Sequence, residues 1–509
     1  MKYLLLITLT FFCSYAFSQT PEEGLRTAWF TQNGTARTNA VGGAIGSLGG
    51  DLTAANINPA GLGMYKTSEF VLSLGALKNN NSFDFRGTTS NNDKGIFRYG
   101  PMGFVIGSPT SSNKKSGSIA FSLSVNQLAS YNNRLTFSGY NNYSSFSEQF
   151  IEELTRDNAD TNAALSNYIF GSTLAFRTYL VDTLNDAAGK FVGYKSLVPI
   201  TSGVNQYFDA ITKGGYHEIA IGVAGSERNK WYYGGSLIIP LVSYQRILDY
   251  SEYDATNNTN NKFGYFKFNE TLKSFGVGLG LKLGTIYRPN ENVRLGLAFH
   301  TPQFIGFKDR IRASMTTNTE NLKGTLSETS NALNDNNPGE RSYTITTPYR
   351  AIASASYFFS NSENVKQQRG FISTDVEFVN YRGVRFSKTN EYGESVKGYY
   401  KTLNNTIKEI YKGNINVKVG GEIKFYPIAV RLGAAYYGSP YQDETIKADR
   451  FVLTGGLGYR AKGMFIDLSF SQAVVNEVQF PYRLNDVANT YAVQTGNTQT
   501  VMMTVGFKL

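Results

Sequence analysis

Phe275-Gly276-Val277-Gly278-Leu279-Gly280-Leu281-Lys282-Leu283 places apolar residues strictly in turn with small or charged ones. Successive side chains of a β-strand point to opposite faces, so this alternation predicts a strand with one apolar face. The same pattern recurs over 119–125, 293–299 and 464–470. The sequence therefore predicts an all-β protein, although a β-sandwich would alternate in the same way.

Connection lengths separate the two architectures. Short connections such as 288–290 and 461–462 take turns with long ones at about 141–215, 309–346, 389–414 and 480–497. Outer-membrane barrels have short periplasmic turns and long extracellular loops, whereas a sandwich has no reason to sort its loops. We therefore expect residues 70–509 to form a transmembrane antiparallel β-barrel of about 14 strands. The expected strands are 70–77, 96–108, 117–140, 216–226, 231–250, 262–287, 291–308, 347–359, 370–388, 415–426, 428–438, 449–461, 463–479 and 498–509.

Two of the long loops contain helical patterns, at about 145–154 and 400–410. Such helices can pack on the barrel rim or collect ligand. Both interpretations remain open at this point.

The composition agrees with a barrel. Charged residues make up 17% of the chain, against about 25% in ordinary globular proteins. The 34 Tyr and 35 Phe accompany a mean hydropathy of only −0.28, as expected when half of the strand residues face lipid and half face water. The net charge of +10 is scattered, so nucleic-acid binding is not expected.

The N-terminus has the features of a cleaved secretory signal, residues 1–18. Lys2 precedes an apolar run over 4–12, which is too short to span a bilayer, and 16–18 offer a small-x-small cleavage site. Cys13 could indicate a lipoprotein, but Phe12 stands where a small residue is required. The only cysteine leaves with the signal, so disulfides and thiol chemistry are not expected.

Residues 19–69 differ in character from the strands. They are rich in Gly and Ala, carry scattered apolar residues, and precede the first strand. A barrel of about 14 strands is too wide for side chains alone to fill. We expect this segment to form a hatch inside the barrel.

The run from Gly42 to Leu62, ending in Asn58-Pro59-Ala60-Gly61, resembles the FadL/TodX (OMPP1) family of outer-membrane transporters of fatty acids and hydrocarbons. The resemblance extends to 294–302, 347–349 and 375–381. It implies that 19–69 is a hatch whose signature is matched by Asn58, Pro59, Ala60 and Gly61. The terminal strand, with Phe507 and Leu509, resembles the signal that barrel-assembly machinery recognises.

A catalytic or metal-dependent role is not expected. His217 and His300 are the only histidines, and both fall in predicted strands. No nucleophile elbow is present, and nothing arranges ligands for a metal or cofactor. Some outer-membrane barrels are enzymes. We do not expect an enzyme here, because the sequence shows no nucleophile with a placed base.

The resemblance implies transport of hydrophobic small molecules such as long-chain fatty acids or hydrocarbons, by rearrangement of the hatch. The ligand itself is not identified, and lipopolysaccharide is the expected lipid neighbour. The alternative is a barrel that acts as a partner in protein secretion, as in type IX systems. An apolar interior beneath the loops favours transport, and an exposed apolar loop patch favours the partner role.

The resemblance also implies lateral release through a defect in the third strand. Alternation from Ile119 to Val125 would place Gln127 toward lipid. One explanation is that Gln127 has already reached the outer interface. The other is a bulge or break at Asn126 and Gln127 that interrupts strand pairing.

Overall fold

The computed structural model describes residues 20–509, except 111–116, 257, 360–368, 389–396 and 462. The expected signal sequence and Cys13 lie outside the described residues. In the part that the structure describes, no helix is long and apolar enough to cross a membrane.

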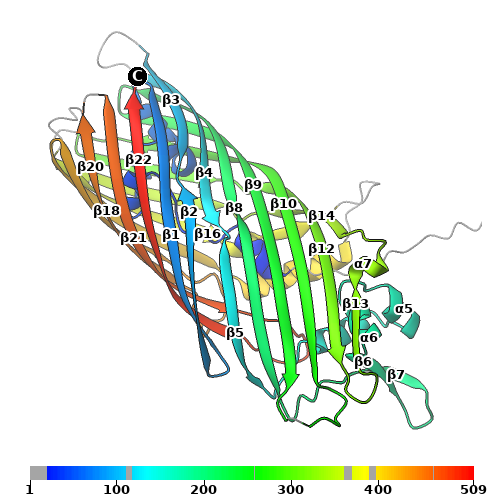
Figure 1. Cartoon of the computed structure of the whole chain (residues 1–509). Helices are drawn as coiled ribbons and strands as arrows, with labels where there is room; N and C mark the ends of the chain where they lie inside the picture. The colour runs from blue at the N-terminus through cyan, green and yellow to red at the C-terminus, as the bar shows by residue number, and fades with distance from the viewer. Residues whose placement is uncertain (1–19, 111–116, 257, 360–368, 389–396, 462) are drawn as a thin grey trace, which may run out of the picture.

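The chain folds as a closed antiparallel barrel of 14 wall segments, which confirms the expected fold class (Figure 1). Closure is made by the first and last strands, which pair from Glu69 to Asp84 of β1. Four wall segments are interrupted and consist of two strands each: β2 with β3, β4 with β5, β11 with β12, and β15 with β14. The wall strands are β1 (Glu69–Phe85), β2 (Thr88–Tyr99), β3 (Met102–Pro109), β4 (Ser118–Ser130), β5 (Asn133–Asn141), β8 (Val204–Glu227), β9 (Trp231–Asp254), β10 (Tyr265–Tyr287), β11 (Val293–His300), β12 (Phe304–Asn318), β14 (Gly339–Thr346), β15 (Arg350–Phe358), β16 (Gly370–Asn380), β18 (Gly413–Phe425), β19 (Ile428–Tyr437), β20 (Arg450–Ala461), β21 (Met464–Gln479) and β22 (Ala492–Lys508).

An apolar belt covers the outside of the wall. In β10, Phe275, Val277 and Leu279 are 56%, 43% and 56% exposed, while Gly284 and Lys282 face inward. In β22 the faces also alternate, since Met503 and Phe507 are exposed and Met502 is buried. Large apolar side chains that point outward around a closed barrel require a lipid environment.

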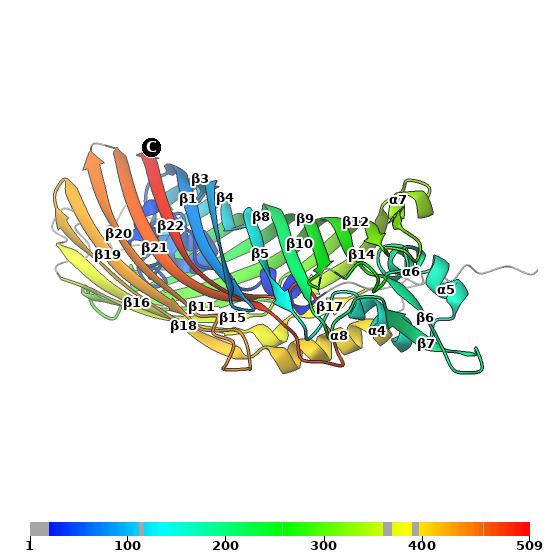
Figure 2. The same ribbon diagram turned by 60° about the horizontal axis from the view of Figure 1, so that its bottom comes forward.

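The two ends of the barrel carry different connections (Figures 1 and 2). One end has the chain terminus and tight connections such as 228–230 and 426–427. The other end has the long connections, with most of the helices and short strands. These are α4 (Glu148–Arg156), α5 (Thr161–Ser166), α6 (Ser172–Arg177), β6 (Val181–Asn185), β7 (Phe191–Ser196), β13 (Thr325–Thr329), α7 (Ser330–Leu333), η2 (Tyr381–Gly383), β17 (Arg385–Ser387) and α8 (Lys397–Ile410).

Several expected loops are shorter than the sequence indicated. Strand β8 begins at Val204, β12 continues to Asn318 and β22 begins at Ala492, so parts of the expected loops 141–215, 309–346 and 480–497 belong to the wall. The connection after the first strand is only 86–87, and the Asn-rich stretch 79–81 lies within β1. These wall portions lie beyond the apolar belt and mix polar with apolar outward residues, so alternation of apolar residues did not mark them as strands. The loop expected at 389–414 is described only from 397, and β18 begins inside it at Gly413.

Residues before β1 form four short helices inside the barrel (Figure 2). Their interior position agrees with the physical argument that a wide barrel needs a filling segment. We call residues 20–68 the hatch. The helices are α1 (Pro21–Arg26), α2 (Ala36–Ala40), α3 (Ala54–Ile57) and η1 (Pro59–Met64).

The sorting of connections predicts the orientation in the membrane. A single cysteine in place of Ala188, at the tip of the β6–β7 hairpin, should react with a membrane-impermeant maleimide on whole cells. A cysteine in place of Asn290, in the turn before β11, should react only after the outer membrane is permeabilised. The opposite labelling pattern would contradict the orientation.

Candidate functional site

The Asn58–Gly61 motif lies against the barrel wall. Asn58 Nδ2 donates to the carbonyl oxygens of Gly46 (2.7 Å), Thr285 (3.3 Å) and Leu297 (3.4 Å), and its Oδ1 accepts from Ala60 N at the start of η1. Thr285 and Leu297 are paired residues of β10 and β11. A side chain on Gly284 would collide with the Asn58 amide, so this glycine allows the close approach. The motif therefore fastens the hatch to two strands.

Buried charged residues of the wall also contact the hatch. Glu218 on β8 receives hydrogen bonds from Asn56 of the hatch (3.0 Å), from Gln303 (2.7 Å) and from Lys282 (2.5 Å). On the facing wall, Asp375 accepts from the backbone N–H of Gly46 at 2.9 Å. Paired charges of this kind are stable in a barrel interior only with their partners in place. Polar contacts, which water could replace, thus help to hold the hatch.

The wall is interrupted between its second and third segments. Strand β3 pairs with β4 from Met102 to Pro109, but the ladder stops at Val125. Among the described residues, β2 pairs only with β1, and β5 pairs only with β8. The strand expected over 96–108 is broken at Gly100-Pro101, where proline cannot donate to a ladder. An unpaired strand edge in a membrane wall leaves backbone groups that need other partners.

Side chains supply those partners. The amide of Asn33, from the hatch, donates to the carbonyl oxygens of Tyr99 on β2 (2.8 Å) and Gln127 on β4 (2.7 Å). Gln127 Oε1 accepts from Tyr99 N at 3.3 Å, and Asn126 Nδ2 donates to Asn33 O at 3.1 Å. On the outer side, Tyr99 stacks on His217 and shares a 2.6 Å hydrogen bond with it. We call this interruption the wall gap, and Asn33 bridges it.

The two residues singled out in the third strand both lie at the wall gap. Asn126 is fully buried, and the pairing of β4 with β8 shifts register between Gln127 and Ala129. The expectation that Gln127 faces lipid is wrong, since it is only 6% exposed and turns toward Tyr99. The alternation of side chains along β4 ends here because the register shift between Gln127 and Ala129 inserts one extra residue into the strand. The hatch motif at Asn58 contacts β10 and β11. It therefore lies apart from Asn126 and Gln127 at the wall gap.

Arg98 is a buried cation beside the wall gap. It is 8% exposed, and its NH2 group donates to Leu128 O at 3.4 Å. Its Nε has no hydrogen-bond partner, and no carboxylate pairs with it among the described residues. A buried guanidinium without an acid is costly, so this position is suited to an anionic group. Nothing in the sequence marked Arg98 or Asn33, because their partners lie far along the chain.

An apolar layer fills the lumen next to this cation. It joins the hatch, the wall and the loop helix α8, and Phe30 packs edge-on against Tyr216 at 5.7 Å. Leu128, at the wall gap, belongs to this layer. Other members are Leu25, Val242, Ile305, Phe307, Tyr343, Ile345, Tyr381, Tyr400, Leu403 and Ile407. The interior beneath the loops is therefore apolar and extends to the wall gap.

The two histidines have structural contacts. His300 Nε2 lies 2.7 Å from the carbonyl oxygen of Ile57 in the hatch, and His217 stacks on Tyr99. Within the described ranges, no group of His, Cys, Asp and Glu is arranged to hold a metal.

A closed barrel with an apolar belt and an internal N-terminal hatch defines a class of plugged outer-membrane protein. Residues 230–508 match the model of the family described as outer membrane protein transport protein (OMPP1/FadL/TodX). Because this match covers more than half of the chain, the protein belongs to that family, which is a transport family. It is an outer-membrane protein.

Solved structures agree on the fold. A Pseudomonas aeruginosa FadL homologue superposes with a TM-score of 0.54 at 13% identity, covering 94% of this chain and 99% of that chain. The Ralstonia pickettii toluene transporter TbuX gives 0.51 at 14% identity, with coverage of 94% and 99%. The Pseudomonas putida toluene transporter TodX gives 0.51 at 13% identity, with the same coverage. No curated protein matches the sequence.

Proposed function

We propose that this protein carries hydrophobic small molecules across the outer membrane and releases them sideways through the wall gap. The observation that carries the proposal is the unpaired edge of β2, which is closed by side chains rather than by a backbone ladder. Intact pairing would seal the wall against lipid. Here, movement of Asn33 with the hatch would free the carbonyl oxygens of Tyr99 and Gln127 and open the apolar layer to the membrane.

Arg98 supports a finer choice among hydrophobic ligands. It presents a buried positive charge without an acidic partner, next to apolar side chains and to the wall gap. A carboxylate at the end of an alkyl chain would satisfy both the cation and the apolar layer. We propose that long-chain fatty acids, rather than neutral hydrocarbons, are the preferred ligands.

Arg98→Met tests this preference. Loss of a charged hydrogen bond costs about 1.5–3 kcal/mol, so oleate uptake should fall roughly ten- to hundredfold, with toluene uptake unchanged. Uptake of both radiolabelled compounds is measured in cells that depend on this protein, with Arg98→Lys as the matched control that keeps the charge. Equal loss of both compounds, or no loss of either, would contradict the preference for an anionic ligand.

One observation favours the second role, a partner in protein secretion. The β6–β7 hairpin carries exposed apolar residues at its outer end, namely Leu184, Phe191 and Val192, which are 43%, 39% and 56% exposed. Exposed apolar clusters of this kind can mark protein contacts. If removal of the whole protein left uptake of both compounds unchanged, this role would be favoured over transport.

A further inference from the structure

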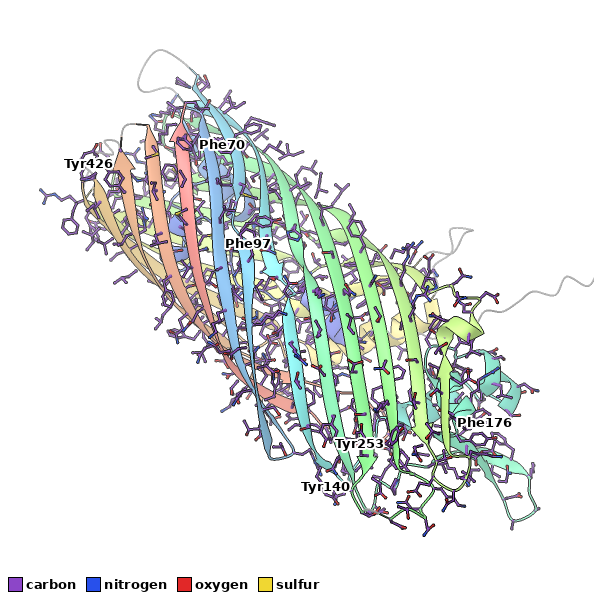
Figure 3. The ribbon with its side chains drawn as sticks, viewed as in Figure 1. Phe70, Phe97, Tyr140, Phe176, Tyr253 and Tyr426 are labelled. Atoms are coloured by element: carbon purple, nitrogen blue, oxygen red, sulfur yellow. The ribbon has the colours of Figure 1, made fainter. Side chains whose placement is uncertain are left out.

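Three strands of the wall are much longer than a bilayer requires. β8 and β9 have 24 residues each and β10 has 23, whereas about 9–11 residues cross the hydrocarbon core. Phe70 and Phe97 lie in the half of the barrel nearer the chain terminus, and Tyr140 and Tyr253 lie near the loop end (Figure 3). The wall therefore projects well beyond the membrane on the loop side.

The outward face changes character abruptly where this projection begins. Along β10 the exposed series from Leu283 to Phe275 is apolar, and the next outward residue is Lys273. Along β12, exposed Phe304 is followed by Lys308 and Arg310. These positions mark the edge of the apolar belt on the loop side.

Strand register gathers the basic residues into one patch. Lys213 on β8 pairs with Gln245 on β9, Gln245 pairs with Lys273 on β10, and Lys273 pairs with Arg310 on β12. Neighbouring strands lie about 4.8 Å apart, so the cluster spans roughly 15 Å. We call Lys213, Lys273, Lys308 and Arg310 the basic patch.

The patch carries more positive charge than the protein balances. Glu340 pairs with Lys308 at 2.8 Å and with Arg310 at 2.9 Å. Lys213 and Lys273 are exposed, and no ion pair is recorded for either among the described residues. Like charges directly opposite, such as Lys273 and Arg310, are unfavourable in a sheet unless an anion lies between them.

The part of the wall formed by β1, β22 and β21 lacks this feature. There the outward row contains Lys78, Gln499 and Gln472, which pair in register across β1, β22 and β21. Lys78 is balanced by Asp93 at 3.5 Å. The row on β1, β22 and β21 therefore carries no such excess of positive charge.

We propose that the basic patch is a binding site for the phosphorylated glycolipid of the outer leaflet, lipopolysaccharide. Its lipid A phosphates would lie at the level of Lys213 and Lys273, and its acyl chains would lie along Phe275, Val277 and Leu279. Lysine and arginine at a membrane boundary bind phosphate strongly through charge-assisted hydrogen bonds. The site binds a structural lipid on the outer surface and is separate from the ligand path through the lumen.

The test is native mass spectrometry of the full-length barrel in mild detergent with diphosphoryl lipid A. Each basic residue near an anionic surface contributes about fivefold, so Lys213→Gln/Lys273→Gln should bind roughly 25-fold more weakly. Lys78→Gln, on β1 and separated from β8 by two wall segments, is the matched control and should bind as the unmodified protein does. Gel mobility before and after heating confirms that each variant is folded.

Two further probes identify the group that is recognised. Dephosphorylated lipid A should lose most of the binding, and phosphatidylglycerol should bind much more weakly than diphosphoryl lipid A. Unchanged binding by the double variant, or equal binding of dephosphorylated lipid A, would overturn the phosphate site. Equal binding of phosphatidylglycerol would overturn the assignment to lipopolysaccharide.

Discussion

A barrel that lacks residues 20–66 is expected to assemble and to conduct ions in planar bilayers, whereas the complete protein stays closed. The hatch contacts the wall through apolar clusters and through polar groups such as Glu218, Asp375 and Thr504, whose partners are Asn56, Gly46 N and Ala36 N. Water entering the emptied lumen can replace these partners, so their loss need not prevent assembly. The wall itself closes through β1 and β22 without the hatch.

Single-channel conductance measures the effect, which should rise from near zero to that of an open pore. Deletion of residues 186–190, at the tip of an external hairpin, is the matched control and should leave the barrel closed. A hatch-deleted barrel that assembles but does not conduct would show that the loops and α8 close the lumen.

Arg431→Met is expected to lower the free energy of unfolding by about 3–5 kcal/mol, because it removes the ion-pair partner of buried Asp467 and the nearest cation of buried Glu422. Arg431 is 1% exposed and contacts Glu422 and Asp467 at 2.6 Å each. Arg37 of the hatch lies 3.6 Å from the same Glu422. The loss should therefore loosen the hatch as well as the wall.

Unfolding by guanidinium chloride in detergent, followed by gel mobility, measures this change. Adding Glu422→Gln and Asp467→Asn to the variant should restore much of the lost stability. Arg310→Met is the matched control, because its ion pair with Glu340 is solvent-exposed and should contribute little to stability. A loss of similar size in both variants would contradict the assigned role of the buried cluster.

The alternation of apolar residues was enough to predict strands, because the faces of each strand are set by neighbouring residues, and the sorting of connection lengths then predicted the barrel. It failed where the wall leaves the lipid. Residues 204–215 of β8 mix Asn205, Asp209 and Lys213 with Tyr207 and Ile211 on the outside, so polar and apolar residues did not separate by face. Gly100-Pro101 was a local signal for the broken strand, although alternation around it suggested continuity.

The contacts that close the wall gap could not be predicted from sequence. Asn33 and Gln127 are 94 residues apart in the sequence. A single asparagine belongs to no sequence pattern from which its hydrogen-bond partner could be predicted. The role of Arg98 could not be predicted either, because it depends on the absence of an acidic partner among the described residues of the folded interior. The resemblance to a transporter family led to Asn126 and Gln127 but not to the hatch residue that contacts them.

Sideways release through the wall gap is tested most directly by a cysteine pair, Asn33→Cys/Asn126→Cys. These residues are in contact, with 3.1 Å between Asn126 Nδ2 and Asn33 O, and Cys13 in the expected signal is the only natural cysteine. The pair would fasten the hatch where it closes the gap. Each single cysteine variant serves as a control for the substitutions themselves.

The measurement is oleate uptake by cells that carry the double variant, before and after oxidation. Mass spectrometry confirms the cross-link. Oxidation should abolish uptake, and a reductant should restore it, while the single variants stay active throughout. If the fully cross-linked protein takes up oleate as fast as the reduced protein, ligand does not leave through this gap.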